Sequence, residues 1–133
     1  NCRFGDPEAQ VILPMLESDL LEILEACVEG RLDQVTPVWQ DAAAVTVVMA
    51  ARGYPGEYAA GHEITGFADA ESAGCLVFHA GAKVIEDRVV SAGGRVLNVT
   101  AVRPTRTAAA RAAYGGVEAL HFYGAQYRRD IGT

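Results

Sequence analysis

Residues 43–51 read AAVTVVMAA, and this stretch indicates the fold more clearly than any other part of the chain. Large apolar side chains recur at every second position, Val45, Val47 and Met49, which is the period of a β-strand. The next five residues, 52–56, read RGYPG and combine glycine with proline, which together stop a strand. The sequence therefore predicts a β-strand that ends at a turn.

Two more apolar runs and a glycine pair follow this strand. The runs cover residues 75–84 and 88–92, and Gly93-Gly94 then leads into a third extended stretch, residues 95–102. Glycine pairs are favoured in the tight turns of β-hairpins. We therefore expect an antiparallel meander of at least these three strands.

Helical patterns flank the predicted sheet on both sides. Residues 104–120 are rich in alanine, with Thr105 or Thr107 as the candidate N-cap and Val117 and Leu120 on the buried face. Residues 8–30 show an apolar stripe of helical period, made of Val11, Ile12, Met15, Leu16, Leu20, Ile23, Leu24, Cys27 and Val28.

The first helical region is expected to form two pieces. Pro14 lacks a backbone donor, Asp19 can cap a second helix, and Gly30 can end it. Helix first, sheet in the middle and helix last make the predicted fold class α+β.

Composition limits the classes of function. The chain has 133 residues, of which 50% are hydrophobic, enough for a soluble globular unit with a core. Its formal net charge of −6 argues against nucleic acid and anionic membranes as partners, because phosphate would be repelled. Three cysteines without paired spacing predict neither a disulfide framework nor a zinc site, and fit reduced thiols in the cytoplasm.

Functional side chains crowd the first eight residues, NCRFGDPE. The amide oxygen of Asn1 suits Mg²⁺, and the guanidinium of Arg3 suits phosphate or carboxylate. Together they suggest the rim of a nucleotide-dependent site. Spacing alone leaves a surface turn that leads into a helix as the other interpretation.

This segment and four later motifs resemble the phosphoribosylamine–glycine ligase family of the ATP-grasp superfamily. The later motifs occur in the family's order at residues 52–56, 77–81, 93–101 and 127–132. Two places depart from the family pattern, because Ala82 stands where Thr is usual and residues 102–104 replace a turn that contains glycine.

The resemblance implies a division into two parts. Residues 1–35 would form the helical C-terminal end of an ATP-grasp domain, and residues 36–133 would form a small β-rich C-terminal domain with an antiparallel sheet and a terminal helix. The implied reaction, a step of de novo purine biosynthesis, joins glycine to 5-phosphoribosylamine and cleaves ATP to ADP and phosphate. Lys83 is the only lysine, so the chain lacks the lysines expected of an ATP-grasp core.

We therefore expect the chain alone to be inactive and to depend on a missing N-terminal portion of the same enzyme. The alternative is a noncatalytic interaction or structural module derived from that ligase.

The resemblance also implies roles for five residues. Asn1 matches a metal ligand for Mg²⁺ or Mn²⁺, and Arg3 would contact the phosphate or acyl phosphate, unless it forms a surface ion pair. Asp6 and Glu8 would bind the glycine ammonium or phosphoribosylamine hydroxyls, or only favour the helix N-terminus. Arg95 would approach a substrate phosphate, although a hairpin turn alone would explain the glycines before it.

Two further expectations concern side chains outside this set. His79 lies in an apolar run and is expected to be a hydrogen-bonded core histidine. Arg128 and Asp130 are expected to form an ion pair near the end of the chain.

Overall fold

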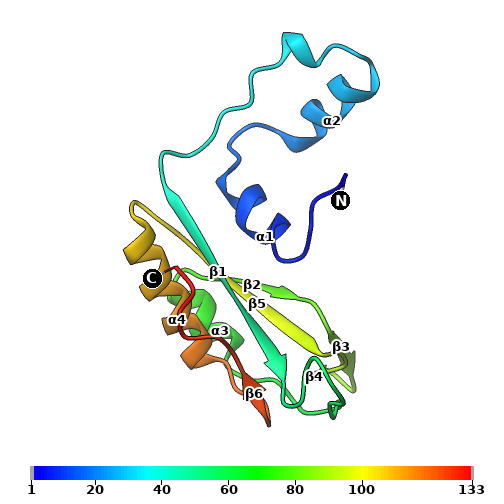
Figure 1. Cartoon of the computed structure of the whole chain (residues 1–133), viewed down its shortest axis with the longest axis vertical. Coiled ribbons are helices and arrows are strands. Elements are labelled where there is room, and N and C mark those ends of the chain that lie inside the picture. Colours follow the sequence, from blue (N-terminus) through cyan, green and yellow to red (C-terminus); the bar gives the residue numbers. More distant parts are fainter. Residues whose placement is uncertain (1, 133) are drawn as a thin grey trace.

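A computed structural model describes residues 2–132 and shows a sheet, helices on both of its faces, and an extended helical arm (Figure 1). The predicted α+β class is confirmed. In chain order the elements are α1 (Ala9–Ile12), η1 (Leu13–Met15), α2 (Leu20–Val28), η2 (Leu32–Gln34), β1 (Ala43–Ala51), α3 (Phe67–Ser72), β2 (Leu76–His79), β3 (Ala82–Ile85), β4 (Arg88–Ser91), β5 (Arg95–Arg103), α4 (Arg106–Ala119) and β6 (Ala125–Gln126).

The main sheet has four antiparallel strands in the order β2-β5-β1-β6. The two long strands β1 and β5 form its centre, with Val47 opposite Val99. Strands β3 and β4 form a separate two-stranded sheet. The predicted strand at residues 43–51 is confirmed at both ends.

The predicted three-strand meander is wrong. Strand β2 pairs directly with β5, while β4 pairs with β3 and not with β5. The run 75–84 breaks at residues 80–81, where backbone bonds continue alongside β5 from Gly81 N to Arg95 O at 2.7 Å. The tight hairpin lies instead at Glu86 and Asp87, whose φ angles of 47° and 62° suit a two-residue turn.

The core lies between one face of the main sheet and the helices α3 and α4. Its largest fully buried apolar side chains are Met49, Leu97, Val47, Val96, Val99 and Val117. Helix α4 begins as predicted, because Thr105 Oγ1 accepts a hydrogen bond of 3.2 Å from Ala108 N. The helix also passes very close to the sheet, since a methyl group on Gly116 would lie 2.9 Å from Val99 Cγ1.

The arm, residues 2–42, forms the two helical pieces that the sequence predicts. Asp19 caps α2 by accepting a 2.7 Å bond from Leu21 N, and Gly30, at a φ of 68°, follows its end. Figure 1 shows α2 well away from the sheet, whereas α1 lies beside β1. Ala26 is the one buried residue among residues 2–42, so α2 exposes its apolar side chains.

Within the arm, the two ends of the segment that contains α2 meet at one place. Leu16 forms a bridge with Trp39, Glu17 N donates to Val38 O at 2.9 Å, and Gln40 N donates to Met15 O at 2.9 Å. These contacts close the excursion that contains α2 just before β1 begins. Within residues 2–132 no helix is long and apolar enough to cross a membrane.

Substitutions on α2 should hardly change stability. Leu21 is 62% exposed and Val28 is 88% exposed. We expect Leu21→Gln and Val28→Gln each to change the free energy of unfolding by less than about 0.5 kcal/mol. Leu97→Ala, at a fully buried position, should lower it by about 2 to 5 kcal/mol. Urea unfolding of the three variants measures this difference, and a large loss at Val28 would show that α2 packs against the body.

Candidate functional site

The N-terminal motif folds into a turn that leads into α1. Gly5 O accepts a 2.9 Å hydrogen bond from Ala9 N, and Ile12 N donates to Glu8 O at 3.0 Å. The carboxylate of Glu8 lies directly over Gly5, where a methyl group would overlap it. Glycine leaves room for this placement of the carboxylate, which a larger residue would displace.

Arg3 and Glu8 line a common pocket on the outer side of this turn. The pocket has a volume of about 330 Å³ and is lined by Arg3, Phe4, Gly5, Glu8 and Ile12. Arg3 is exposed, and its Nη1 donates a 2.8 Å bond to Phe4 O. A guanidinium in such a place can still donate its other N–H groups to a phosphate or carboxylate.

Asp6 has a different environment, because it lies against the sheet. Its Oδ1 accepts bonds from Asn98 Nδ2 at 2.9 Å and Gln10 Nε2 at 3.2 Å. Its Oδ2 pairs with Arg95 Nη2 at 3.1 Å, and its backbone oxygen accepts a 2.9 Å bond from Arg95 Nη1. Asp6 thus joins the motif to β5, on the face of the sheet opposite α4.

The structure therefore separates the expected site residues into two pairs. Arg3 and Glu8 face one pocket, while Asp6 and Arg95 bind each other. The surface ion pair considered for Arg3 is not among the ion pairs of the described residues. Substrate binding by Asp6, Glu8 and Arg95 stays a prediction.

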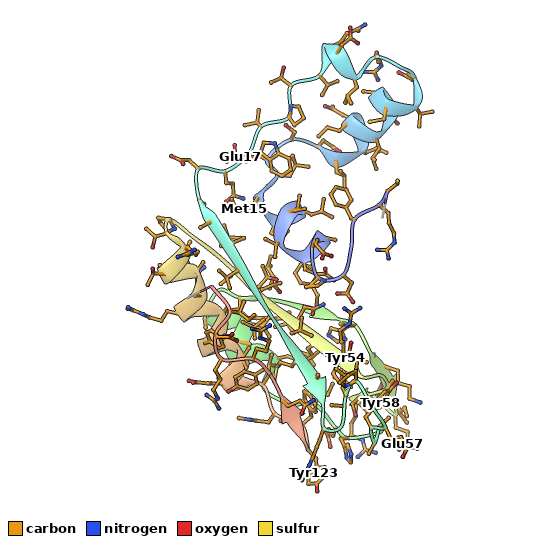
Figure 2. The ribbon with its side chains drawn as sticks, viewed as in Figure 1. Met15, Glu17, Tyr54, Glu57, Tyr58 and Tyr123 are labelled. Atoms are coloured by element: carbon orange, nitrogen blue, oxygen red, sulfur yellow. The ribbon has the colours of Figure 1, made fainter. Side chains whose placement is uncertain are left out.

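Arg95 also lines a second pocket of about 380 Å³, which lies between β1 and the C-terminal segment. Its lining residues are Val48, Ala50, Tyr54, Arg95, Gln126, Tyr127 and Arg128. The ring of Tyr54 packs on Gly94, because a methyl group there would overlap it. Figure 2 shows Tyr54 and Tyr58 gathered in the loop after β1. Gly94 thus allows close approach of aromatic rings, Gly93 lies against the backbone of Gly81, and the pair does not form a hairpin between neighbouring strands.

The ion pair expected between Arg128 and Asp130 is present, and it is exposed. Arg128 Nη2 lies 2.5 Å from Asp130 Oδ2, and Arg128 Nε lies 2.9 Å from Oδ1. These hydrogen bonds hold the pKa of the Asp130 carboxyl below its usual value. Arg128 also lines the second pocket, so the pair lies at the edge of that pocket.

His79 differs from the prediction. The structure places it at the exposed end of β2, where its ring stacks on Phe67 with 5.2 Å between ring centroids. The expectation of a hydrogen-bonded core histidine is wrong, because the strand ends there and its neighbour Ala80 is exposed as well. Cys75 is the buried thiol of this region, and burial raises its pKa, which disfavours the reactive thiolate form.

A third pocket, with a volume of about 510 Å³, is unsuited to phosphate. Its lining includes two carboxylates, Glu63 and Glu118, and no arginine or lysine. Figure 2 shows Tyr123, which also lines it, at the far end of the molecule from Met15 and Glu17. It holds none of the residues expected to bind substrate.

Asn1, the expected metal ligand, lies outside the described residues. Within residues 2–132 no group of three or more His, Cys, Asp or Glu side chains could hold a metal ion.

Sequence reasoning missed Gln10 and Asn98. Gln10 follows Asp6 by four residues, a spacing at which side chains meet on a helix. Asn98 stands as an amide inside a run of buried apolar residues, which is a signal that a sequence can show.

Comparisons with known proteins agree on one family. A family profile described as "Phosphoribosylglycinamide synthetase, C domain" matches residues 44–133. The chain is 54% identical over 133 residues to the trifunctional purine biosynthetic protein adenosine-3 of Bos taurus, covering 99% of this chain and 13% of that protein. It is 52% identical over 134 residues to the phosphoribosylamine–glycine ligase of Nostoc sp., covering 99% of this chain and 32% of that ligase.

A solved structure agrees with these relatives. The crystal structure of phosphoribosylamine–glycine ligase from Thermotoga maritima superposes with a TM-score of 0.72 at 36% identity, covering 98% of this chain and 32% of that one. The chain thus spans about a third of the length of the ligases that it matches.

Proposed function

Since this chain belongs to the phosphoribosylglycinamide synthetase family, we propose that it serves as the C-terminal portion of a phosphoribosylamine–glycine ligase. The proposed reaction uses ATP, glycine and 5-phosphoribosylamine. The terminal phosphoryl group of ATP passes to the glycine carboxylate, which releases ADP. The amine of phosphoribosylamine then attacks the acyl carbon, phosphate leaves, and the amine loses a proton.

The contribution of this chain to such chemistry is electrostatic. Phosphoryl transfer depends on in-line positioning and on offsetting negative charge. Arg3 supports this role because its guanidinium is exposed at a pocket while the adjoining turn is anchored through Asp6. This exposed guanidinium on an anchored turn is the observation that carries the proposal.

The other expected residues receive separate roles. Glu8, across the same pocket, is proposed to bind an ammonium or hydroxyl group of the substrates. Arg95 is proposed to hold a phosphate oxygen from the second pocket, beside Arg128. The Asp6 carboxylate already binds Gln10, Asn98 and Arg95, so its anchoring role is better supported than direct substrate contact.

A divalent ion would add positive charge close to the ATP phosphates. Asn1 is proposed as one ligand for Mg²⁺ or Mn²⁺, with the remaining ligands supplied by a part of the ligase outside this chain. In the part of the chain that the structure describes, no three His, Cys, Asp or Glu side chains come together to hold an ion.

The arm supports a division of the ligase between two regions. Residues 1–35 are proposed to pack with an ATP-grasp domain, because α2 presents Leu21, Leu24 and Val28 to solvent. Residues 36–133 are proposed to form the C-terminal domain. The family profile begins within this second part, at residue 44.

The isolated chain is expected to fold and to release no ADP from ATP in the presence of Mg²⁺, glycine and phosphoribosylamine. A chimera tests the proposal directly: this chain replaces the matching C-terminal third of the Nostoc ligase. We expect ADP release that depends on all three substrates, within about tenfold of the Nostoc enzyme. A folded chimera without activity would favour the noncatalytic module, and turnover by the isolated chain would contradict the need for a second portion.

A further inference from the structure

Asn98 is a polar side chain in the most deeply buried strand of the molecule. It is 0% exposed and lies between Leu97 and Val99, which are 0% exposed as well. Its Nδ2 donates to Asp6 Oδ1 at 2.9 Å, whereas its Oδ1 is buried and has no hydrogen-bond partner among the described residues. The bond to Asp6 spans 92 positions in the sequence.

A half-satisfied amide is unfavourable for the body of the fold. A buried acceptor without a partner loses its hydration and gains nothing in return, so an apolar residue at this place would serve the strand better. The side chain of Asn98 therefore contributes one interaction of value, its bond to a carboxylate. Hydrogen bonds to an ionised group are shorter and stronger than neutral ones.

The bond fixes the segment that carries the candidate pocket. Asp6 lies between Arg3 and Glu8, inside the turn that the bond from Ala9 N to Gly5 O closes. Arg95 is the other anchor: its ion pair with Asp6 joins side chains that are both more than a third exposed, so solvent screens it, and its Nη1 also donates a 2.9 Å bond to the Asp6 backbone oxygen. The bond from Asn98 is part-buried, because the Asp6 side chain is 38% exposed, but its donor belongs to a fully buried side chain in the middle of β5 and so gives Asp6 a fixed point of attachment on the sheet.

We infer that Asn98 is a positioning residue, which acts through Asp6 to hold Arg3 and Glu8 in place at their pocket. Its anchoring action is a property of this chain alone. Its value for catalysis rests on the function proposed above.

Asn98→Val in the 133-residue chain separates anchoring from stability. Valine suits a buried strand and removes the half-satisfied amide. The unfolding midpoint in urea is expected to stay the same or rise. Amide hydrogen exchange at Ala9 and Ile12, whose N–H groups bond within the turn, is expected to become about tenfold faster. Exchange at Val47 and Val99 in the core should not accelerate.

Thr100→Val is the matched control. Thr100 is also 0% exposed, lies two residues along the same strand, and bonds to Thr46 Oγ1 at 2.8 Å. It therefore shares the face of Asn98 without touching Asp6. Exchange at Ala9 and Ile12 is expected to keep its original rate in this variant.

Exchanging the amide and the carboxylate between positions 98 and 6 tests whether Asp6 is the partner through which Asn98 acts. Asn98→Asp alone opposes two carboxylates and should accelerate exchange at Ala9, while Asp6→Asn combined with Asn98→Asp restores one amide–carboxylate bond and slows it again. Unchanged exchange at Ala9 and Ile12 in Asn98→Val would overturn the inference. So would faster exchange throughout the body together with a lower unfolding midpoint, because that is the behaviour of a merely structural residue.

Activity gives an independent readout in the Nostoc chimera. Asn98→Val is expected to lower kcat about tenfold with little change in KM for ATP, because Arg3 is still present but poorly held. A chimera that shows no activity would count against the proposed function and leave the exchange result standing. Normal kcat in an active chimera would show that the anchor does not serve catalysis.

Discussion

Arg3→Ala in the Nostoc chimera is expected to lower kcat about a hundredfold, since one donor that meets developing charge is commonly worth this much. KM for ATP should change little. The reason is that a contact made mainly in the transition state lowers kcat and kcat/KM together. Arg3→Lys should recover only part of the loss, because an ammonium cannot reproduce the planar guanidinium fork. Steady-state kinetics with each substrate varied in turn measures these effects.

Arg31→Ala is the control for Arg3. Arg31 is another arginine of the arm, where it pairs with Glu29, and it lines neither of the pockets that contain an expected site residue. We expect kcat in this variant to match the parent chimera. If Arg3→Ala raised only KM for ATP, Arg3 would contribute to binding of the ground state and not to the chemical step.

Gly116→Leu is expected to lower the free energy of unfolding by about 3 kcal/mol, which is a large fraction of the stability of a small domain. The first added carbon alone would lie 2.8 Å from Cys75 Sγ and 2.9 Å from Val99 Cγ1. Both neighbours are buried, so relief requires α4 to move away from β5. Urea unfolding and thermal melting measure the loss.

The same substitution at the neighbouring glycine, Gly115, is expected to have the opposite effect on stability. Gly115 is exposed, and a methyl group there would meet nothing within 4 Å. Gly115→Leu should raise the free energy of unfolding by about 0.5 to 1 kcal/mol, because leucine favours a helix far more than glycine does. Equal effects at the two positions would show that helix propensity, and not contact with the sheet, governs this part of α4.

Local signals in the sequence are enough for several elements. The alternation in residues 43–51, the cap at Asp19 and the cap at Thr105 each depend on neighbours within a few positions. Strand pairing does not. The partner of β2 is β5, and nothing local distinguishes it from β4, which comes between them in the chain. The hairpin turn at Glu86 and Asp87 was also missed, because neither residue is the glycine or asparagine usual at a positive φ.

The residues of the candidate site likewise include some that local sequence signals bring together and others that only the folded chain brings together. Arg3 and Glu8 are close in sequence and could be assigned to one place from the motif alone. The contact between Asp6 and Arg95 joins positions 89 residues apart, and a single sequence carries no periodicity that predicts it. Asn98 was available as a signal, since an amide within a buried run needs a partner, but its partner could be identified only in the folded chain.

Contacts of Leu16 with Trp39 and of Met15 with Gln40 close the base of the segment that contains α2, so this segment forms a long loop. Because the two ends of this loop meet just before β1, the position at which β1 enters the sheet does not depend on the residues of α2. Changes in the length or in the surface side chains of α2 therefore leave the register of β1 against β5 undisturbed. A segment of this kind is free to follow the shape of whatever neighbour it meets, while the sheet that carries Arg95 and Asn98 keeps its sequence constraints.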